Sequence, residues 1–527
     1  MSRSSLFKAA GLIAVVTVLS KFLGLLRDQF IAHAYGASMV SDAYLYAFQI
    51  PSFALILLGG LGGPFHTATI AVLSRLIPAE HAPTETAQKL VNNFITLTGV
   101  VFLLFSVLAF FAAKPLIAII AADASEQLKT VATLHLRWMS PMILIGGVIG
   151  IFYGISNLYK QYFWPSISPS AINLTLILWL WVLGPDDLGL SLAISTTIGA
   201  ILQLMVQLPE FYKIGFRYFP SWSFKAEGLE TVSKMLFPAT IGTTIGQLNV
   251  YVAMFFASQL AEGSWTAFVL GNRLIQLPIG VLTIGMLVPL FPRFNQWVAE
   301  EKPDALRDDI HVGVLSMWLF ALPLVVITVL LAEPGIRLLF ERGAFVHHDT
   351  VLVSSVLVVL AFSVLPYMLR DAVTRVFYAY HDSKTPLIAG MASIALNALL
   401  NALLVSWLDI TGIAISTVAV TMSNAIILMW LVRRHTKELA FTALFSKSIM
   451  MVLSSLICYG AGFGVQSLLP QAQTIWMLVI QILLVMLAVF VSYCLFLLLL
   501  KEPLALRFAH KVVSHPKFPF RKVNGLG

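Results

Sequence analysis

The chain has 527 residues, of which 59% are hydrophobic and 11% are charged, and its mean hydropathy is +0.89. These values lie far outside the range of soluble globular proteins and indicate a polytopic membrane protein. The formal net charge is +8, and no connection between apolar segments is long enough to fold as an extramembrane catalytic domain.

A membrane-spanning helix needs roughly 20 mostly apolar residues, and fourteen segments of the chain meet this requirement. They lie at 6–33, 40–77, 90–112, 130–158, 165–183, 188–209, 231–260, 264–298, 309–332, 350–379, 385–407, 411–433, 446–468 and 474–500. The first has Arg3 and Lys8 before an apolar run, as in a signal peptide, but the run is long and lacks a convincing cleavage site. The sequence therefore predicts an all-α protein with about fourteen transmembrane helices, the first of them retained.

The lysine and arginine residues are distributed unequally between the two sides of the membrane. If the N-terminus is cytoplasmic, the outer connections carry Lys114, Lys129, Arg337 and Arg342, whereas the inner connections and both ends carry far more. This positive-inside bias places both termini in the cytoplasm. The basic tail, 501–527, then faces anionic lipid headgroups, and we do not expect a nucleic-acid partner.

The first helix carries charge at a depth where charge is costly. It contains Lys21, Arg27 and Asp28, and each ionisable side chain in a bilayer costs at least about 2.5–3.5 kcal/mol. Lys21, Gly24 and Asp28 share a face of an ideal helix, so Arg27 reaches the same cavity only if the helix deforms, for which Gly24 is the candidate. In the alternative, Arg27 and Asp28 extend to the membrane interface.

The second helix is predicted to bend. A straight helix over 40–77 would be about 57 Å long at 1.5 Å per residue, well beyond the hydrocarbon core. Pro51 removes a backbone hydrogen bond, and Gly59–Pro64 tolerates unusual dihedral angles. Because irregular backbone at membrane depth needs protein or water around it, and because Asp42 opens this helix, we expect it to line a cavity. A kink that only improves packing is the alternative.

The second half of the chain repeats the first. Three landmarks recur at an offset of 221 residues: Tyr159 and Tyr380, Pro165 and Pro386, and Ala193–Thr196 and Ala414–Thr417. More loosely, Pro51 and Pro64 correspond to Pro278 and Pro289. Two sets of six helices then have the same orientation, which predicts two lobes related by a pseudo-two-fold axis along the membrane normal, a transporter architecture.

The repeat divides the chain into four predicted parts. These are an N-terminal lobe, 1–225, a C-terminal lobe, 226–440, two further helices, 441–500, and the basic tail, 501–527. The two further helices are apolar and serve either packing or a lipid-chain groove. They contain Cys458 and Cys494, the two cysteines of the chain, so neither a disulfide framework nor a cysteine metal site is predicted.

Polar residues of the second lobe complete the candidate site. Asn272 and Arg273 precede Pro278 on a kinked helix, and Arg273 adds a third cation to Lys21 and Arg27. Surplus positive charge calls for an anionic ligand, and arginine binds phosphate through its bidentate fork. Arg370–Asp371 and Arg137 are interpreted as structural ion pairs or interface residues.

Intramembrane asparagines offer a weaker ion site. Asn397 and Asn401 lie four residues apart and either coordinate a cation or hydrogen-bond a neighbouring helix, which is the commoner role. His66 and the pair His347–His348 lack partners at ligand spacing, so no metal site is predicted.

Three stretches of the chain carry a resemblance to a known family. They are SKFLGLLRD at 20–28, HAYGASMVSDAYLYAFQIP at 33–51 and GNRLIQLPIGVLTIGMLVPLFP at 271–292. With fourteen helices and a six-plus-six repeat, the sequence resembles the MurJ (MviN) family of bacterial lipid II flippases, within the multidrug/oligosaccharidyl-lipid/polysaccharide exporter superfamily. The similarity extends over nearly the whole chain.

The resemblance implies translocation of the undecaprenyl-diphosphate-linked peptidoglycan precursor from the inner to the outer leaflet by alternating access. It further implies that Lys21, Arg27 and Arg273 hold the diphosphate, and that Asp42 acts near an outer gate, with Asp28 and Asn272 also lining the gate or cavity. The implied location is the bacterial inner membrane, and the role is peptidoglycan synthesis, cell wall biogenesis and cell shape. Helices 441–500 would form a groove for the polyprenyl tail.

The sequence departs from the family pattern at two places. The family often has basic residues after the helix-two proline, where this chain has Leu55 and Ile56. Some members bind sodium through an acidic residue in helix seven, where this chain has Asn249 and Ala253. A sodium site built from Asn249, Asn397 and Asn401 would lack its carboxylate, so membrane potential is an alternative driving force.

Two other functions compete with this interpretation. An exporter of another undecaprenyl-linked oligosaccharide would have a similar cavity, whereas an intramembrane transferase needs a carboxylate or histidine cluster that the sequence lacks. We therefore expect a transporter rather than an enzyme, without a cofactor. Its expected partners are the lipid-linked substrate, membrane lipids and cell-wall synthesis proteins.

Overall fold

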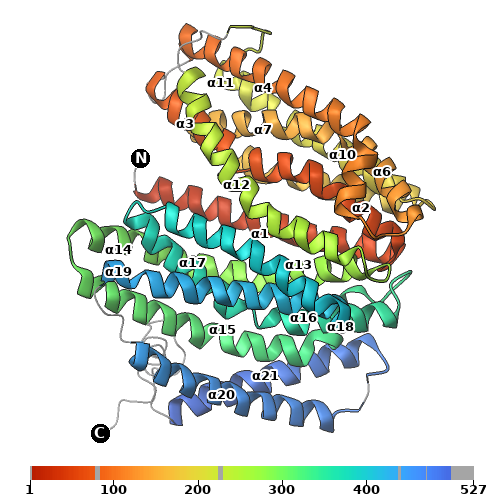
Figure 1. Ribbon diagram of the computed structural model, residues 1–527, viewed down its shortest axis with the longest axis vertical. Coiled ribbons are helices and arrows are strands. Elements are labelled where there is room, and N and C mark those ends of the chain that lie inside the picture. The colour runs from red at the N-terminus through yellow and green to blue at the C-terminus, as the bar shows by residue number, and fades with distance from the viewer. Residues whose placement is uncertain (1–2, 77–82, 224–228, 437–440, 471, 500–527) are drawn as a thin grey trace. The chain divides into compact units, whose positions relative to one another are not determined.

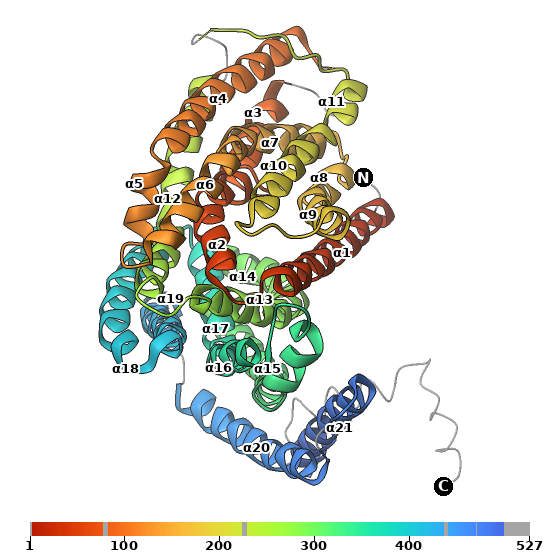
Figure 2. The same ribbon diagram turned by 90° about the vertical axis from the view of Figure 1, so that its right-hand side faces the viewer.

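The computed structural model describes residues 3–76, 83–223, 229–436, 441–470 and 472–499. Within these ranges all regular secondary structure is helical and no strand occurs (Figures 1 and 2). The predicted all-α fold class is thereby confirmed. Each of the fourteen predicted segments overlaps a helix of the structure.

The chain forms two compact units. Unit 1 comprises Met1–Ala267 together with Phe340–Asp349, and unit 2 comprises Phe268–Leu339 together with Thr350–Gly527. The predicted lobes divide instead at residues 225 and 226, after the sixth helix of the repeat. That division by sequence repeat stays a prediction.

Unit 1 is built from short and long helices around a buried apolar core. Its helices are α1 (Arg3–Tyr35), α2 (Met39–Ser52), the π-helix η1 (Phe53–Leu58), α3 (Pro64–Leu76), α4 (Glu85–Phe111), α5 (Ala113–Ile120), α6 (Glu126–Met139), α7 (Pro141–Leu158), α8 (Phe163–Ile167), α9 (Ser170–Leu183), α10 (Leu190–Met205), α11 (Leu208–Ile214) and α12 (Leu229–Ala257). The hydroxyls of Thr84 and Ser125 cap α4 and α6 by accepting backbone N–H groups of the first turn. Phe65, Phe94 and Phe102 lie at the centre of the core that joins α3, α4 and α7.

Unit 2 continues from α13, whose first turn belongs to unit 1. Its helices are α13 (Ser264–Leu282), the π-helix η2 (Thr283–Leu287), α14 (Val288–Ala299), α15 (Pro303–Phe340), α16 (His347–Ala361), α17 (Val364–Ala379), α18 (Lys384–Leu431), α19 (Arg433–Thr436), α20 (Phe441–Leu468) and α21 (Ile475–Leu499). The last two helices pack on α15 through a core that includes Leu330, Cys458 and Val489.

Some of these helices, alone or joined end to end, are long and apolar enough to span a membrane. Within the described ranges, nine helices are long and apolar enough to cross a membrane, or ten if α16 and α17, which are bent by 44°, form one span. Two predicted segments, 385–407 and 411–433, both fall in α18, which breaks at Asp409 (φ 49°). The 14-residue α9 is shorter than a span. The protein is thus a multi-pass membrane protein, and the number fourteen stays a prediction.

The two helices whose prolines correspond in the repeat, α2 and α13, are each followed by a π-helix. Pro51 lies inside α2, η1 follows at Phe53, and irregular backbone over 59–63 separates η1 from α3. Pro278 lies inside α13, and η2 follows at Thr283. A proline removes one backbone hydrogen bond, and π-helical turns are frequent at functional sites.

Candidate functional site

Arg27 is held by two acceptors inside unit 1. Its Nε and Nη2 atoms donate to Asp28 Oδ1 at 3.1 and 2.8 Å, and Nη1 donates to Asn173 Oδ1 of α9 at 3.0 Å. The side chains of Arg27 and Asp28 are 13% and 4% exposed, so this is a largely buried ion pair. Because a guanidinium has five N–H donors, two remain for another acceptor.

Lys21 lies on the same helix in a different environment. Its side chain is exposed, and no acceptor of the described residues lies within hydrogen-bonding distance of its ammonium group. Helix α1 runs without interruption through Gly24, where a Cβ atom would lie 3.8 Å from Asn173 Nδ2. The predicted deformation at Gly24 stays a prediction. Helix α1 therefore presents one exposed cation and one cation fixed by neighbours.

Asp42 is buried and caps a second helix. Its Oδ2 atom accepts the Gly263 N–H at 2.7 Å, and Oδ1 accepts the N–H and the hydroxyl of Thr266 at 2.7 and 2.6 Å. Only 3% of Asp42 is exposed. A carboxylate at a helix N-terminus satisfies free N–H groups and interacts favourably with the helix dipole. Asp42 therefore fastens the start of α2 to the start of α13.

Leu55 and Ile56, the apolar residues after the helix-two proline, have different surroundings. Leu55 lies in η1 and is buried, whereas 58% of Ile56 is exposed. The backbone of Leu55 lies close to Gly146 of α7, where an added Cβ would be 2.5 Å from the Leu55 nitrogen. A cation at position 55 would be enclosed by the core, so position 56 is where a longer polar side chain fits.

Arg273 and Asn272 lie on α13 in unit 2, five and six residues before Pro278, and both are half-buried. The neighbouring Gly271 packs closely against Val356 of α16. The third predicted cation therefore stands on the proline-containing helix of unit 2, as predicted from the sequence order.

The predicted ion-site asparagines are divided between the units. Asn249 lies in α12 of unit 1, where it is half-buried. Asn397 and Asn401 lie in α18 of unit 2 and are buried, and Asn397 Oδ1 accepts hydrogen bonds from Asn401 Nδ2 at 3.0 Å and from the Ser416 hydroxyl at 3.1 Å. Ser416 follows the break at Asp409, so these bonds link the two segments of α18.

The charged side chains of α17 and α6 make other contacts. Asp371 accepts from Arg375 Nη2 at 3.1 Å, so its ion-pair partner lies one turn later on the helix and is not the adjacent Arg370. The Arg370 guanidinium lies 4.3 Å from the ring centre of Tyr367, and that of Arg137 lies 5.9 Å from the ring of Phe110. Both are cation–π contacts.

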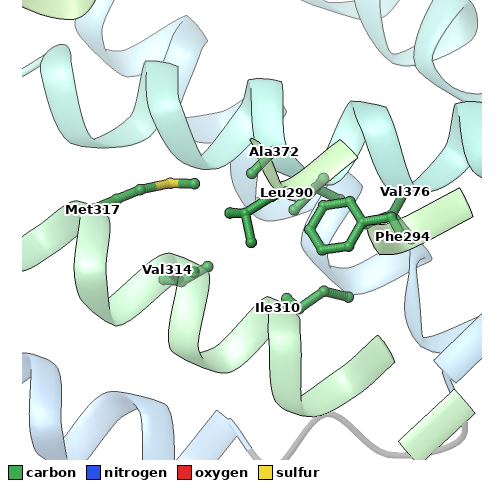
Figure 3. Close-up of a pocket in the computed structure, with 9 residues that line it drawn as sticks. Leu290, Phe294, Ile310, Val314, Met317, Ala372 and Val376 are labelled. Carbon is green, nitrogen blue, oxygen red and sulfur yellow. The ribbon is translucent and has the colours of Figure 1, made fainter. Parts of the chain in front are cut away.

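A small pocket in unit 2 is wholly apolar. Figure 3 shows side chains of α14, α15 and α17 around it, among them Leu290, Phe294, Met317 and Val376. These side chains offer no donor to an anion. This pocket is therefore not a candidate for binding a charged headgroup.

The sequence did not indicate two partners in the candidate site. Asn173 is an isolated polar residue in an apolar segment, and its burial in a membrane helix is the signal that points to it. Thr266 lies in the first turn of α13, where helix starts favour capping contacts. Among the described residues no group of three or more histidine, cysteine, aspartate or glutamate side chains could hold a metal ion.

Comparison with known proteins gives a consistent answer. Residues 31–487 match the family model for "Lipid II flippase MurJ". The chain is 34% identical over 452 residues to the "Probable lipid II flippase MurJ" of Synechocystis sp., covering 83% of this chain and 84% of the relative. It is 28% identical over 422 residues to the protein of the same description from Buchnera aphidicola subsp. Schizaphis graminum, with coverage of 79% and 81%.

Two solved structures share the fold. One, described as "Lipid II flippase MurJ, inward closed conformation", has a TM-score of 0.77 at 23% identity and covers 93% of this chain and 100% of its own. The other is an inward-facing multidrug resistance MATE family transporter of the MOP superfamily, with a TM-score of 0.64 at 14% identity and coverage of 83% and 99%.

Proposed function

We propose, from the premise that the chain belongs to the MurJ family of lipid II flippases, that it moves lipid II across the bacterial inner membrane. The substrate would be the undecaprenyl-diphosphate-linked peptidoglycan precursor, carried from the inner to the outer leaflet for cell wall synthesis. The protein is accordingly a transporter and not an enzyme.

The observation that best supports this proposal is the arrangement of cations on α1. A diphosphate needs several N–H donors to replace its water, and charge-assisted hydrogen bonds are the strongest available. Lys21 offers an exposed ammonium group, and Arg27 keeps two N–H donors while Asp28 and Asn173 fix its orientation. We propose that these two cations, with Arg273, bind the diphosphate.

Asp28 supplies a counter-charge for Arg27 in this site. While no anion is bound, its carboxylate balances the charge of Arg27 at 2.8 Å in surroundings where an unpaired charge would be costly. An arriving phosphate competes with that carboxylate for the guanidinium. We propose that this exchange, together with opening of the Asp42 contacts to Gly263 and Thr266 on the outer side, accompanies alternating access.

The remaining parts of the proposal concern energy and partners. We propose that no cofactor is needed and that membrane potential drives the cycle, since moving one charge through 100 mV is worth about 2.3 kcal/mol. Both termini would be cytoplasmic, α20 and α21 would hold the polyprenyl tail, and the protein partners would be cell-wall synthesis proteins.

The test is depletion of the protein in its host while the leaflet that holds lipid II is measured. We expect lipid II to accumulate in the inner leaflet and the intact gene to restore its transfer. An Arg273→Ala copy should insert into the membrane but fail to restore transfer, whereas Arg75→Ala, an exposed arginine of α3, should restore it. If lipid II still crosses and another surface glycan disappears, the protein exports a different undecaprenyl-linked oligosaccharide.

A further inference from the structure

Three turns of unit 1 form what we name the three-turn junction, in which the α1–α2 turn contacts each of the other two. They are the α1–α2 turn (33–38), the α12–α13 turn (258–266) and the α15–α16 segment (Phe340–Asp349). The third is distant in sequence, and the helices on either side of it, α15 and α16, lie almost wholly in unit 2. This segment therefore belongs to unit 1, where it packs against the α1–α2 turn, although the residues on either side of it belong to unit 2.

Backbone contacts hold the segment in place. The Ala344 N–H donates to the His33 carbonyl at 2.8 Å. The Asp349 carboxylate accepts the N–H of Ala37 at 3.3 Å and that of Val346 at 3.1 Å, so it joins the α1–α2 turn to its own segment. Phe345 of the same segment is 1% exposed. The segment is thus anchored by the buried Phe345 and Asp349, while His33 and Ala344 lie at the exposed edge of the contact.

Two glycines permit this close approach. Gly36 has a φ of 63°, and an added Cβ atom would lie 2.6 Å from the Ala344 carbonyl oxygen. Gly343 has a φ of 66°, and an added Cβ atom would overlap the carbonyl oxygen and the ring of His33. Glycine suits both positions because it adopts positive φ freely and has no side chain. The α1–α2 turn and the Phe340–Asp349 segment therefore each have a glycine where the backbone of the other lies closest.

The junction also contains every passage of the chain between the units. The chain crosses between them after Ala267, before Phe340 and after Asp349. Asp42 caps the helix that makes the first crossing, and Phe340–Asp349 lies between the other two. The hydrogen bonds of the junction are few and individually modest, so they can break and re-form.

We propose that Phe340–Asp349 is a strap that keeps the outer side of the transporter closed and that releases the α1–α2 turn once in each transport cycle. The proposal rests on the proposed function for its direction, because the outer side must open to deliver the substrate. A hydrogen-bonded strap without a covalent tie suits this role, since it closes specifically and opens reversibly.

The test locks the strap. His33→Cys and Ala344→Cys are introduced together with Cys458→Ala and Cys494→Ala, and the purified protein is placed in vesicles with fluorescent lipid II. We expect normal transfer in reductant, at least a tenfold slower transfer after oxidation, and recovery when reductant is added again. A crosslinked protein that transfers lipid II at the reduced rate would overturn the proposal.

A second measurement needs neither the crosslink nor a substrate. Gly343→Ala should loosen the strap, so a cysteine at position 37 should react several-fold faster with a membrane-impermeant maleimide. Gly335→Ala is the matched control, because an added Cβ meets nothing within 4 Å there. Equal labelling of both variants would contradict the strap. Faster labelling together with failure to move lipid II would retain the strap and reject only the proposed substrate.

Discussion

The two proline-kinked helices are alike in sequence and differ in how they are packed. In unit 1, η1 lies against α7, and a Cβ added at Gly59 would overlap the carbonyl oxygen of Gly146. In unit 2, a Cβ added at Gly285 of η2 would meet no atom within 4 Å. The same kink is therefore enclosed by neighbouring backbone in one unit and open in the other.

The neighbouring helix accounts for the difference. Helix α7 presents Gly146, Gly150 and Gly154 to the kinked helix, and a Cβ at Gly150 would lie 2.8 Å from Phe65. At the repeat offset of 221 residues, α17 has Tyr367, Asp371 and Arg375 at the equivalent positions. Three small residues on α7 let two backbones touch, and α17 lacks such a stripe at the corresponding positions.

The equivalence of these two stripes is supported by the ends of the helices. Helix α7 ends at Leu158 and α17 at Ala379, and each is followed two residues later by a non-glycine residue with positive φ, Lys160 at 61° and His381 at 58°. The two halves thus share the helix ends and the kinks, whereas the glycine stripe of α7 corresponds to Tyr367, Asp371 and Arg375 on α17. Of the two kinked regions, we therefore expect η1 to stay rigid against α7 and η2 to change conformation.

The largest expected effect comes from adding a methyl group to each kink. Gly59→Ala should lower the free energy of unfolding by about 3 kcal/mol, because rigid backbone would have to move. Gly285→Ala should be neutral or stabilising by up to about 1 kcal/mol, because alanine favours helix and space is open. Thermal unfolding in detergent measures both. Equal losses would show that the two kinks are packed alike.

The next effect concerns how each unit holds an arginine. Asn173→Ala removes an acceptor from buried Arg27 and should cost about 1.5–3 kcal/mol, since hydrogen bonds to charged groups are strong. Tyr367→Ala removes the ring that lies 4.3 Å from the Arg370 guanidinium and should cost about 0.5–1 kcal/mol. Chemical denaturation of each variant makes the comparison. A larger loss for Tyr367→Ala would reverse our ranking of the two sites.

Removing each proline tests whether the kinks serve transport. Pro51→Ala and Pro278→Ala should both fold, because each restores a backbone donor within a helix. We expect Pro278→Ala to slow lipid II transfer more, on the order of tenfold or about 1.4 kcal/mol, since η2 is the open kink. The measurement is the rate of lipid II transfer in vesicles for each variant. Slower transfer by Pro51→Ala than by Pro278→Ala would place the adaptable kink in unit 1.

The smallest effect is a pH dependence of unit 1 outside the membrane helices. Burial of the Asp186 carboxylate raises its pKa. The hydrogen bonds that it accepts from the N–H groups of Ser191, Leu190 and Leu188 together lower the pKa by more, so the net pKa is below its usual value. The carboxylate therefore stabilises the fold above the unfolded pKa of about 3.9, and this stabilisation is lost as pH falls through the folded pKa.

Asp382 of unit 2 gives the matching case. Its pKa is lowered by the Thr385 hydroxyl and N–H groups. Asp186→Asn and Asp382→Asn should each flatten the loss of stability between pH 5 and 3, by less than about 1 kcal/mol. Melting temperatures across that range provide the measurement. A steeper acid loss in either variant would contradict the sign.

Much of the fold could be predicted from the sequence because hydrophobic length and proline position act locally. The helical segments, the break after Pro51 and the repeat offset follow from such local signals. The packing of the two kinks could not be predicted, because it depends on which residues of a distant helix face them. For the same reason the sequence located Arg27 and Asp28 but did not reveal Asn173 as their partner.

Asp42 is another residue whose contacts could not be predicted from the sequence. Its position at the start of the second helix indicated a special role, yet the donors to its carboxylate were unpredictable, since Gly263 and Thr266 lie more than 220 residues away. The packing of the strap could not be predicted for the same reason. These ten residues, from the end of α15 to the start of α16, carry no sequence signal that they pack on the α1–α2 turn in unit 1.

The central claim is that the cations of α1 bind the diphosphate of the substrate. Its most direct measurement compares transfer of fluorescent lipid II by the intact protein, Arg27→Ala and Arg75→Ala in vesicles, with circular dichroism confirming the fold of each. We predict at least tenfold slower transfer for Arg27→Ala and an unchanged rate for Arg75→Ala. Transfer at the intact rate by a folded Arg27→Ala protein would contradict the account.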